Sequence, residues 1–290
     1  MIDFEYHAPT SLDQVFELLE QHGDDARVMA GGTALVIQMK QRLSQPGHVV
    51  GLRQVGSLNA IESTPDGLRI GALCTQRQIE NDIVVAQDLP LLSDTFRKVA
   101  TPRIRNMATI GGGLVNGDPN QDPPPTLIAL GASAVMTSKS GDRTVPVEEL
   151  FIDYYETDVQ PGEILTSVLV PKASAGSGSV YLKFLPRTAD DYGTVSVASV
   201  VSKEQDGSCK DVRIVLGSAG VTPIRATEAE DALRGKPLTD ENIRAAAALV
   251  KGAVDPLDDF RGSAEYKTDM AEVFARRAVE QAMAAIPAGS

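Results

Sequence analysis

The chain has 290 residues, of which 42% are hydrophobic and 23% charged, and its formal net charge is -12. This length exceeds the usual size of one hydrophobic core and predicts two or three packed units in an ordinary globular protein. The excess of acidic side chains argues against a nucleic-acid partner, because binding to phosphates relies on clustered Lys and Arg. No stretch approaches the roughly 20 apolar residues of a membrane-spanning helix.

The N-terminal residues, cysteines and histidines bear on compartment and metal chemistry. The start of the chain has acids where a secretory signal has a basic region, and no apolar run follows, so we expect a cytoplasmic protein. In a cytoplasmic protein, the widely separated Cys74 and Cys209 predict small buried side chains rather than a disulfide or a cysteine-ligated cluster. His7, His22 and His48 show none of the spacings of common zinc sites, so we predict no metal site.

The first part of the chain predicts a helix and then a strand-loop-helix unit. Residues 11–23 place apolar side chains on one helical face, with Ser11 as N-cap, Gln14 completing a capping box and Gly23 as the stop. Residues 26–43 run from a short strand through a Gly-Gly turn into a second helix that starts near Thr33.

The middle of the chain predicts short strands, two hairpins and one short helix. The turn signals are Pro65-Asp66-Gly67 and Ser140-Gly141-Asp142. The expected elements are a strand at 48–52, hairpins at 58–74 and 133–147, a helix at 125–132 and a strand at 164–171. This mixture of short elements indicates an α+β fold.

Residues 172–179 (KASAGSGS) lack any large apolar side chain and predict a linker. We place the main boundary there, which gives domains at 1–175 and 176–290. The second domain predicts an antiparallel meander and three helices, with caps at Thr227 and Thr239. Its expected strands are 180–185, 194–201 and 209–217, and its expected helices are 226–235, 239–254 and 263–286.

Two glycine-rich loops, AGGTAL at 30–35 and ATIGGGL at 108–114, point to an anionic ligand. Glycine lets the backbone come close to a ligand, and successive N–H groups can then point at phosphate oxygens. If the loops face each other, they could clamp a pyrophosphate with backbone donors and the Thr33 and Thr109 hydroxyls. The second loop alone fits neither the dinucleotide fingerprint nor the P-loop, and a plain structural turn is the alternative.

Taken together, four segments resemble the FAD-binding medium subunits of molybdenum hydroxylases, the group of aerobic carbon monoxide dehydrogenase and xanthine dehydrogenase. They are AGGTALVIQMK, RIRNMATIGGGLVNGDPNQDPPPTLIALGA, EILTSVLVP and KFLPRTADDYGTVSVA, in the family's order. The resemblance implies a vanillyl-alcohol oxidase-like FAD-binding domain at 1–175, with lobes at roughly 1–56 and 57–175. A domain of three antiparallel strands and a helical bundle would follow at 176–290.

The resemblance also implies roles for the loop residues. The two loops around the FAD pyrophosphate would be formed by Ala30, Gly31, Gly32, Thr33, Ala34 and Leu35 and by Ala108, Thr109, Gly111, Gly112 and Gly113. Many relatives carry Ser, His or Asp at the position of Ala34, so a side-chain contact is absent here. Neither loop contains His or Cys, and we therefore expect non-covalent FAD.

Four further residues resemble family positions in the flavin pocket, each with a structural alternative. Asp122 would hydrogen-bond the flavin's sugar hydroxyls, or it caps a helix. Leu165 would line the adenine or flavin pocket, or it is a strand-core leucine. Lys183 would reach the polar edge of the isoalloxazine, or it is a solvated strand residue. Tyr192 would lie near the ring face, or it is a loop aromatic.

The family implies an electron relay. A large subunit oxidises substrate at a molybdenum cofactor, a small subunit carries iron-sulfur clusters, and this chain's FAD passes the electrons to an external acceptor. We expect a dimer of such heterotrimers, with no catalytic acid-base residue in this chain. The alternatives are a self-contained FAD-dependent oxidoreductase with its own substrate pocket and a cofactor-free assembly subunit. Arg103 and Arg105 are candidate contacts to a partner or acceptor, or part of a solvated helix face.

Overall fold

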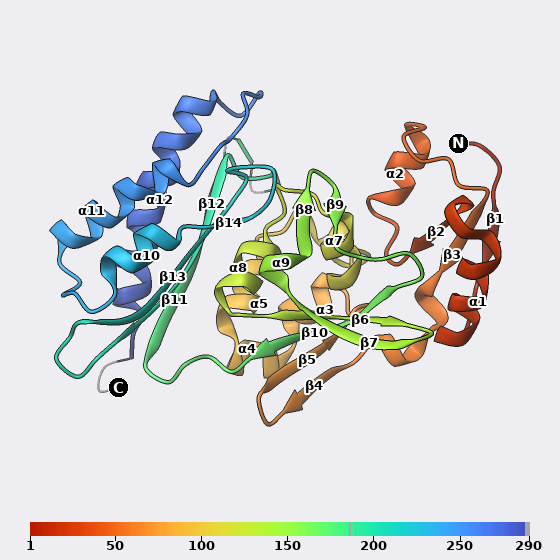
Figure 1. The fold of residues 1–290 in the computed structure, drawn as a ribbon, viewed down its shortest axis with the longest axis horizontal. Helices are drawn as coiled ribbons and strands as arrows, with labels where there is room; N and C mark the ends of the chain where they lie inside the picture. Colours follow the sequence, from red (N-terminus) through yellow and green to blue (C-terminus); the bar gives the residue numbers. More distant parts are fainter. Residues whose placement is uncertain (186, 189, 288–290) are drawn as a thin grey trace.

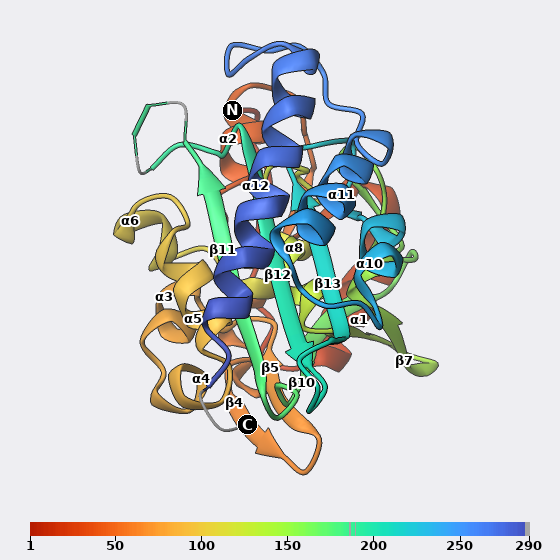
Figure 2. The same ribbon diagram turned by 90° about the vertical axis from the view of Figure 1, so that its left-hand side faces the viewer.

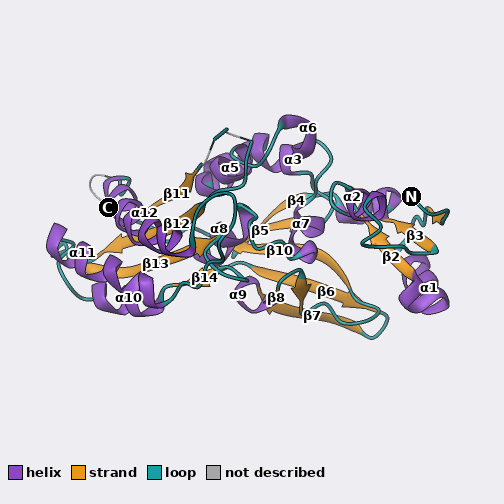
Figure 3. Cartoon of the chain, turned by 90° about the horizontal axis from the view of Figure 1, so that it is seen from above, coloured by secondary structure: helices purple, strands orange, loops and turns teal. Residues whose placement is uncertain are grey.

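The computed structural model describes residues 1–185, 187–188 and 190–287. The described chain forms an elongated α+β molecule in which an N-terminal lobe, a middle lobe and a C-terminal domain lie in a row (Figures 1 and 3). The N-terminal lobe is at one end of the row and the helices of the C-terminal domain are at the other. The predicted fold class and the order of its parts are therefore confirmed.

The N-terminal lobe is a parallel sheet in the order β1-β3-β2. Its elements are β1 (Glu5–His7), α1 (Leu12–His22), β2 (Ala26–Met29), α2 (Leu35–Lys40) and β3 (His48–Gly51). Ser11 caps α1 and Gly23 ends it, as predicted. The second half of the capping box is wrong, because the Gln14 side chain accepts from Thr10 N–H. Val15 and Phe16 of α1 pack against Val50 of β3 in a small separate core.

The middle lobe is an antiparallel sheet in the order β4-β5-β10-β6-β7, and both predicted hairpins form. Its sheet strands are β4 (Ile61–Thr64), β5 (Gly67–Gly71), β6 (Ser133–Ser138), β7 (Gly141–Pro146) and β10 (Ile164–Pro171). Its helices are α3 (Gln76–Asn81), α4 (Ile83–Asp88), α5 (Pro90–Arg97), α6 (Pro102–Arg105), α7 (Ile110–Asn116), α8 (Pro123–Ala129) and α9 (Val147–Leu150). A small hairpin joins β8 (Phe151–Asp153) to β9 (Glu156–Thr157).

The C-terminal domain is the predicted antiparallel meander with helices packed on one face, as Figure 2 shows. Its strands are β11 (Ser177–Phe184), β12 (Val195–Lys203), β13 (Cys209–Gly217) and the short β14 (Ile224–Arg225). Its helices are α10 (Thr227–Leu233), α11 (Asp240–Leu249) and α12 (Ala264–Ala284). Thr239 caps α11 as predicted. The predicted cap at Thr227 is wrong, because α10 begins at Thr227 itself, after Ala226.

The sheet of the C-terminal domain lies between two helical layers. On its outer face, Ala271, Ala275 and Ala278 of α12 are fully buried in the domain's own core. On its inner face, Tyr181 and Val215 belong to the core of the middle lobe, where α8 packs on β12 and β13. The C-terminal domain therefore shares one of its two cores with the lobe before it.

The two cysteines agree with the sequence-based expectation, and the three histidines lie close together. Cys74 and Cys209 are free and buried, and burial raises the pKa of both thiols to about 11. His7, His22 and His48 each offer a ring nitrogen within 4.8 Å of the others. Their spacing in the sequence did not reveal this proximity, because β1, α1 and β3 bring distant residues together, and the absence of a metal site stays a prediction. None of the described helices has the length and apolar character that crossing a membrane requires.

Candidate cofactor site

The two glycine loops lie against each other, as the clamp hypothesis requires. A Cβ atom on Gly31 would lie 1.9 Å from the Met107 carbonyl oxygen, just before the second loop. A Cβ atom on Gly112 would lie 3.3 Å from the Cβ of Ala30 and 2.9 Å from Thr109 Oγ1. A real Cβ at Gly31 would collide with the Met107 backbone, and one at Gly112 would crowd Ala30 and the Thr109 hydroxyl. Glycine at these positions therefore allows the close approach of the loops.

The first loop presents unpaired donors. Gly32 has φ +72°, a left-handed conformation that suits glycine, and it turns the chain between β2 and α2. Among the described residues, the backbone N–H groups of Gly31, Gly32, Thr33 and Ala34 have no hydrogen-bond acceptor, and neither does the Thr33 hydroxyl. A run of unpaired N–H groups in a turn is an anion-binding arrangement. The helix after the loop begins at Leu35, later than the predicted start near Thr33.

The second loop differs, because its backbone donors are already used. Thr109 caps α7, and its hydroxyl oxygen accepts from Gly112 N–H at 3.1 Å. Gly111 N–H donates to Ala72 O and Gly113 N–H to Thr109 O. The expectation that both loops present backbone donors therefore agrees with the first loop only. The second loop contributes a surface without side chains, and the Thr109 hydroxyl retains its proton for donation.

A buried polar cluster lies between the middle lobe and β11. Asp122 is 2% exposed, and its carboxylate accepts from Lys183 Nζ at 2.9 Å and from the Tyr181 hydroxyl at 2.5 Å. Burial raises the pKa of Asp122, while Lys183 and Tyr181 oppose the rise. The Lys183 side chain is only 4% exposed and also donates to Lys98 O. The reading of Lys183 as a solvated strand residue is therefore wrong. The helix-cap reading of Asp122 is also wrong, because its side chain makes no cap hydrogen bond.

A second carboxylate, Asp118, orients the aromatic residue predicted near the flavin ring. The Tyr192 hydroxyl donates to Asp118 Oδ2 at 2.9 Å, while half of the residue's surface is exposed. Burial of the hydroxyl and the charge of Asp118 raise the pKa of Tyr192. Burial and Asp118 also raise the pKa of Tyr155, whose N–H donates to Gly117 O beside the second loop. These contacts fix both phenols in the neutral form.

Four residues near this site, Asp118, Tyr155, Lys98 and Gln76, were not predicted from the sequence. Asp118 and Tyr155 were unmarked, although Asp118 lies in the quoted motif that contains Asp122. Lys98 donates to Tyr181 O, and burial lowers its pKa. Gln76 donates its N–H to Ala108 O, and its buried side-chain oxygen has no partner among the described residues. The one available signal was that Asp118 lies in the run Gly-Asp-Pro-Asn at 117–120, since Gly, Asp, Pro and Asn favour turns.

Two other predicted residues lie outside this cluster. Leu165 is buried on β10 in the main core, in agreement with the strand-core alternative. Arg105 is 6% exposed, and its guanidinium binds Glu80 at 2.9 Å and the carbonyl oxygens of Val99 and Ala100. Both surface readings of Arg105 are therefore wrong, because α6 directs this side chain inward. Arg103 is exposed.

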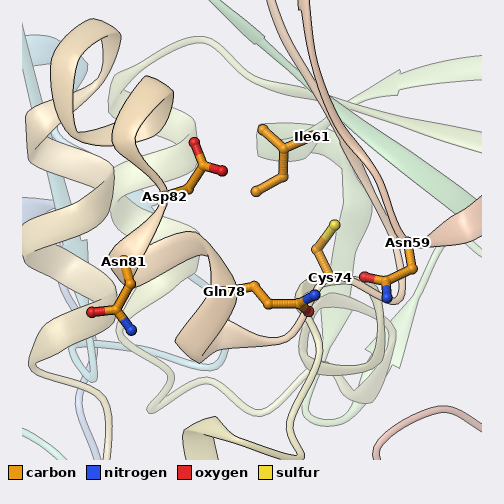
Figure 4. Close-up of a pocket in the computed structure, with 6 residues that line it drawn as sticks. All are labelled: Asn59, Ile61, Cys74, Gln78, Asn81 and Asp82. Carbon is orange, nitrogen blue, oxygen red and sulfur yellow. The ribbon is translucent and has the colours of Figure 1, made fainter.

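A separate pocket lies beside Cys74 (Figure 4). It is lined by Asn59, Ile61, Cys74, Gln78, Asn81 and Asp82. The Cys74 carbonyl accepts from Ile110 N–H, which places Cys74 at the N-terminal end of α7. None of the predicted site residues lines it, and its thiol is held in the neutral form by burial.

The fold and the site suit a class of protein: one that binds a nucleotide cofactor such as FAD. The first loop supplies unpaired donors for an anion, Gly31 and Gly112 allow the two loops to approach each other, and Asp118, Asp122 and Lys183 supply fixed polar groups. These residues fit FAD, whose pyrophosphate needs donors and whose sugars need acceptors.

Comparison with known proteins defines the family. A family model for the FAD binding domain in molybdopterin dehydrogenase matches residues 2–173, and a model for the CO dehydrogenase flavoprotein C-terminal domain matches residues 180–282. The chain belongs to this family of FAD-binding oxidoreductase subunits.

Individual relatives match over nearly the whole chain. The carbon monoxide dehydrogenase medium chain of Afipia carboxidovorans is 40% identical, with 97% of each chain covered. The 6-hydroxypseudooxynicotine dehydrogenase complex subunit alpha of Paenarthrobacter nicotinovorans is 33% identical, over 97% of this chain and 94% of that one. A solved structure of carbon monoxide dehydrogenase from Hydrogenophaga pseudoflava, which lacks the Mo-pyranopterin moiety, superposes with TM-score 0.95 at 36% identity, covering 99% of this chain and 100% of that one.

Proposed function

We propose that this chain is the FAD-carrying electron-transfer subunit of a cytoplasmic molybdenum hydroxylase complex. It takes electrons from iron-sulfur clusters on one partner and passes them to an external acceptor. The observation that supports this role most directly is the pair of apposed glycine loops, one with four successive unpaired N–H groups, in a chain whose relatives are medium chains of dehydrogenases.

Each part of the site has a proposed binding role. The N–H groups of 31–34 and the hydroxyls of Thr33 and Thr109 would hold the pyrophosphate, and Ala108 and Gly111 to Gly113 would give it space. Asp122 would accept from the sugar hydroxyls with an oxygen lone pair left over from Lys183 and Tyr181. Leu165 keeps its proposed place in the wall of the adenine or flavin pocket.

The proposed chemistry is that of the cofactor, placed and tuned by this chain. Bound flavin supplies the ability to accept electrons in pairs and release them to another acceptor. Lys183, held by Asp122, puts a fixed positive charge beside the proposed isoalloxazine edge and does not need to move a proton. Tyr192, anchored by Asp118, covers the proposed ring face and excludes water from it. No side chain of this chain is required to act as an acid or a base.

The partners are inferred from the relatives and from the family resemblance. The names "medium chain" and "complex subunit" belong to proteins that work in multi-subunit assemblies. We propose a large subunit with the molybdenum cofactor and a small subunit with iron-sulfur clusters, assembled as a dimer of heterotrimers. Arg103, which is exposed on α6 just ahead of the second loop, is our candidate contact with a partner or acceptor.

Reconstitution with each subunit omitted in turn tests this function. Flavin reduction is followed by stopped-flow absorbance while an aldehyde, a purine or carbon monoxide is supplied. We expect the isolated chain to bind FAD and to leave it oxidised, with reduction only when both partners are present.

Two outcomes would overturn the proposal. Reduction of the isolated chain by one of these substrates at the rate of the complex would favour the self-contained oxidoreductase. A purified chain without flavin absorbance that also takes up no added FAD would favour the assembly subunit.

A further inference from the structure

The chain contains three histidines, and all three meet at one place. His7 ends β1, His22 ends α1 and His48 begins β3. They are therefore supplied by three elements that are packed together by the small core of the N-terminal lobe. No function proposed above uses them.

The geometry suits a shared ligand. His7 Nε2 lies 3.0 Å from His48 Nδ1, and each of the three residues offers a nitrogen within 4.8 Å of the others. Ligand nitrogens in a tetrahedral site with Zn–N bonds of about 2.0–2.1 Å lie about 3.4 Å apart. Binding of one ion by all three residues therefore requires the distance between the His7 and His48 nitrogens to increase slightly. It also requires the His22 nitrogen to move closer to both. The rings of His22 and His48 are stacked with centroids 3.6 Å apart, so shared binding requires the His22 ring to turn out of this stacked position.

The surroundings favour a bound cation. Glu5 Oε2 lies 3.7 Å from His48 Nδ1, and its exposed side chain is free to move toward the cluster. The Asp25 carboxylate accepts from Gly47 N–H and thereby fixes the residue before His48. His22 lies in the last turn of α1, where the helix dipole is negative.

We propose that His7, His22 and His48 bind one divalent transition-metal ion of the zinc type. Three imidazoles and a nearby carboxylate match the ligands that Zn²⁺, Co²⁺ and Ni²⁺ prefer, whereas Mg²⁺ and Ca²⁺ prefer oxygen alone. The neutral imidazoles keep one proton each, because the proton shared between His7 and His48 moves to the other nitrogen of its own ring. The ion links β1, α1 and β3, and it stabilises the folded lobe by binding that state.

This site is distinct from the candidate cofactor site formed by the two glycine loops. In the parallel register His48 pairs with Glu5 and with Ala26, which are the first residues of β1 and β2. The first glycine loop follows Met29, at the opposite end of β2. His7 pairs with Val50, which also pairs with Val28, so the histidines and the first glycine loop share one small sheet. None of the three histidines belongs to either glycine loop, and the metal proposal does not depend on the proposed function.

The absence of any other histidine makes the test direct. The full-length chain, without an affinity tag and stripped with a chelator, is titrated with Zn²⁺ by calorimetry and by proton NMR of the imidazole C–H signals. We expect one equivalent to bind and the signals of all three histidines to shift together. Zn²⁺ at saturation should raise the Tm of the wild type. Co²⁺ should give the visible absorption bands of a nitrogen-ligated site.

Variants locate the site. His7→Gln, His22→Gln and His48→Gln should each weaken Zn²⁺ binding by at least about tenfold, since even loss of an outer-shell partner costs about 10- to 100-fold. Glu17→Gln removes an exposed carboxylate of α1 outside the cluster and should leave the affinity unchanged. The proposal is overturned if wild-type imidazole signals do not respond to Zn²⁺, or if binding survives in all three variants with unchanged affinity.

Discussion

The buried contact between Asp122 and Lys183 contributes to folding stability and, in our proposal, to cofactor binding. Both side chains are almost fully enclosed, and each satisfies the charge of the other. Removing one partner of such a pair leaves an uncompensated buried charge, which costs about 3–5 kcal/mol, whereas replacing both can be nearly neutral. The same carboxylate is our proposed acceptor for the flavin sugars, so stability and cofactor affinity should be separable by mutation.

We expect Asp122→Asn to lower the free energy of unfolding by about 3–5 kcal/mol and to weaken FAD binding about tenfold, the scale of one charge-assisted hydrogen bond. Lys183→Met in the same chain should restore most of the stability and none of the sugar contact. Urea denaturation and flavin fluorescence titration measure the two quantities. Recovery of FAD affinity in the double variant would show that Asp122 acts on the cofactor only through folding.

The glycines of the two loops make a matched set of variants. Gly31→Ala places a methyl group against the Met107 carbonyl, and Gly112→Val places a branched side chain between Thr109 and Ala30. Both should abolish FAD retention, seen as loss of flavin absorbance relative to protein absorbance, because the loops cannot keep their separation. Gly56→Ala is the control, since a Cβ there meets nothing within 4 Å. Normal flavin content in both loop variants would contradict the clamp.

At the scale of elements, a single carboxylate anchors the start of α12. Asp259 Oδ1 lies 2.8 Å from Lys267 Nζ, a buried ammonium group, and Asp259 Oδ2 accepts from the Arg261 guanidinium. Burial alone would raise the pKa of Asp259, but the hydrogen bonds from Arg261 and Lys267 outweigh it and lower the pKa to about 2. The folded pKa is below the ordinary value of 3.8, so its stabilisation is present above about pH 4 and is lost as the pH falls toward 2.

Asp259→Asn should therefore destabilise the protein at pH 7 by about 1–3 kcal/mol, the cost of leaving a buried donor without its partner. The difference from the wild type should shrink as the pH is lowered from 4 toward 2. Urea denaturation at a series of pH values measures it, with Asp255→Asn as an exposed control in the same loop. A difference that stays constant down to pH 2 would show that the contact does not depend on the charge of Asp259.

Elements set by short-range signals were predictable from the sequence, and contacts across elements were not. The cap at Ser11 and the turn at Pro65-Asp66-Gly67 depend on residues within a few positions, and both form. The same dependence on neighbouring residues explains why the glycine loops could be identified from the sequence before their contact was known. It also explains the failure at Thr227, because Ala226 N–H donates to Ile214 O, so a backbone contact with the distant strand β13 and not a side-chain cap holds the residue before the helix.

The failures at the site share one cause. Lys183 and Asp122 are 61 residues apart, and Arg105 and Glu80 are 25 apart, so their pairing depends on the tertiary fold. A lysine on a strand and an arginine on a short helix carry no local mark that distinguishes burial from exposure. The three histidines are separated in the same way and meet only through β1, α1 and β3.

At the scale of the whole molecule, the exposed linker agrees with the proposed boundary at 175/176, whereas the shared core joins the two domains. Residues 172–175 are exposed, and β11 begins at Ser177. Tyr181, Ala198 and Val215 nevertheless pack into the core of the middle lobe. The chain can therefore be cut at the linker without exposing either core.

We expect limited trypsin digestion to cleave after Lys172 and yield fragments near 1–172 and 173–290 that elute together in size-exclusion chromatography. The buried contact through Tyr181 is the reason, since it resembles a domain core rather than a transient interface. Mass spectrometry of the co-eluting peak identifies the cut. Fragments that separate without denaturant would contradict the shared core.

The unequal use of backbone donors in the two glycine loops has a consequence for the protein without its nucleotide. The second loop keeps its internal hydrogen bonds, so its amide protons remain protected from exchange with deuterated water. The N–H groups of 31–34 gain acceptors only from a ligand, so their exchange should slow by orders of magnitude when FAD binds. Deuterium uptake followed by mass spectrometry would therefore record cofactor loading almost entirely through one segment of the N-terminal lobe, with α7 as a silent internal reference.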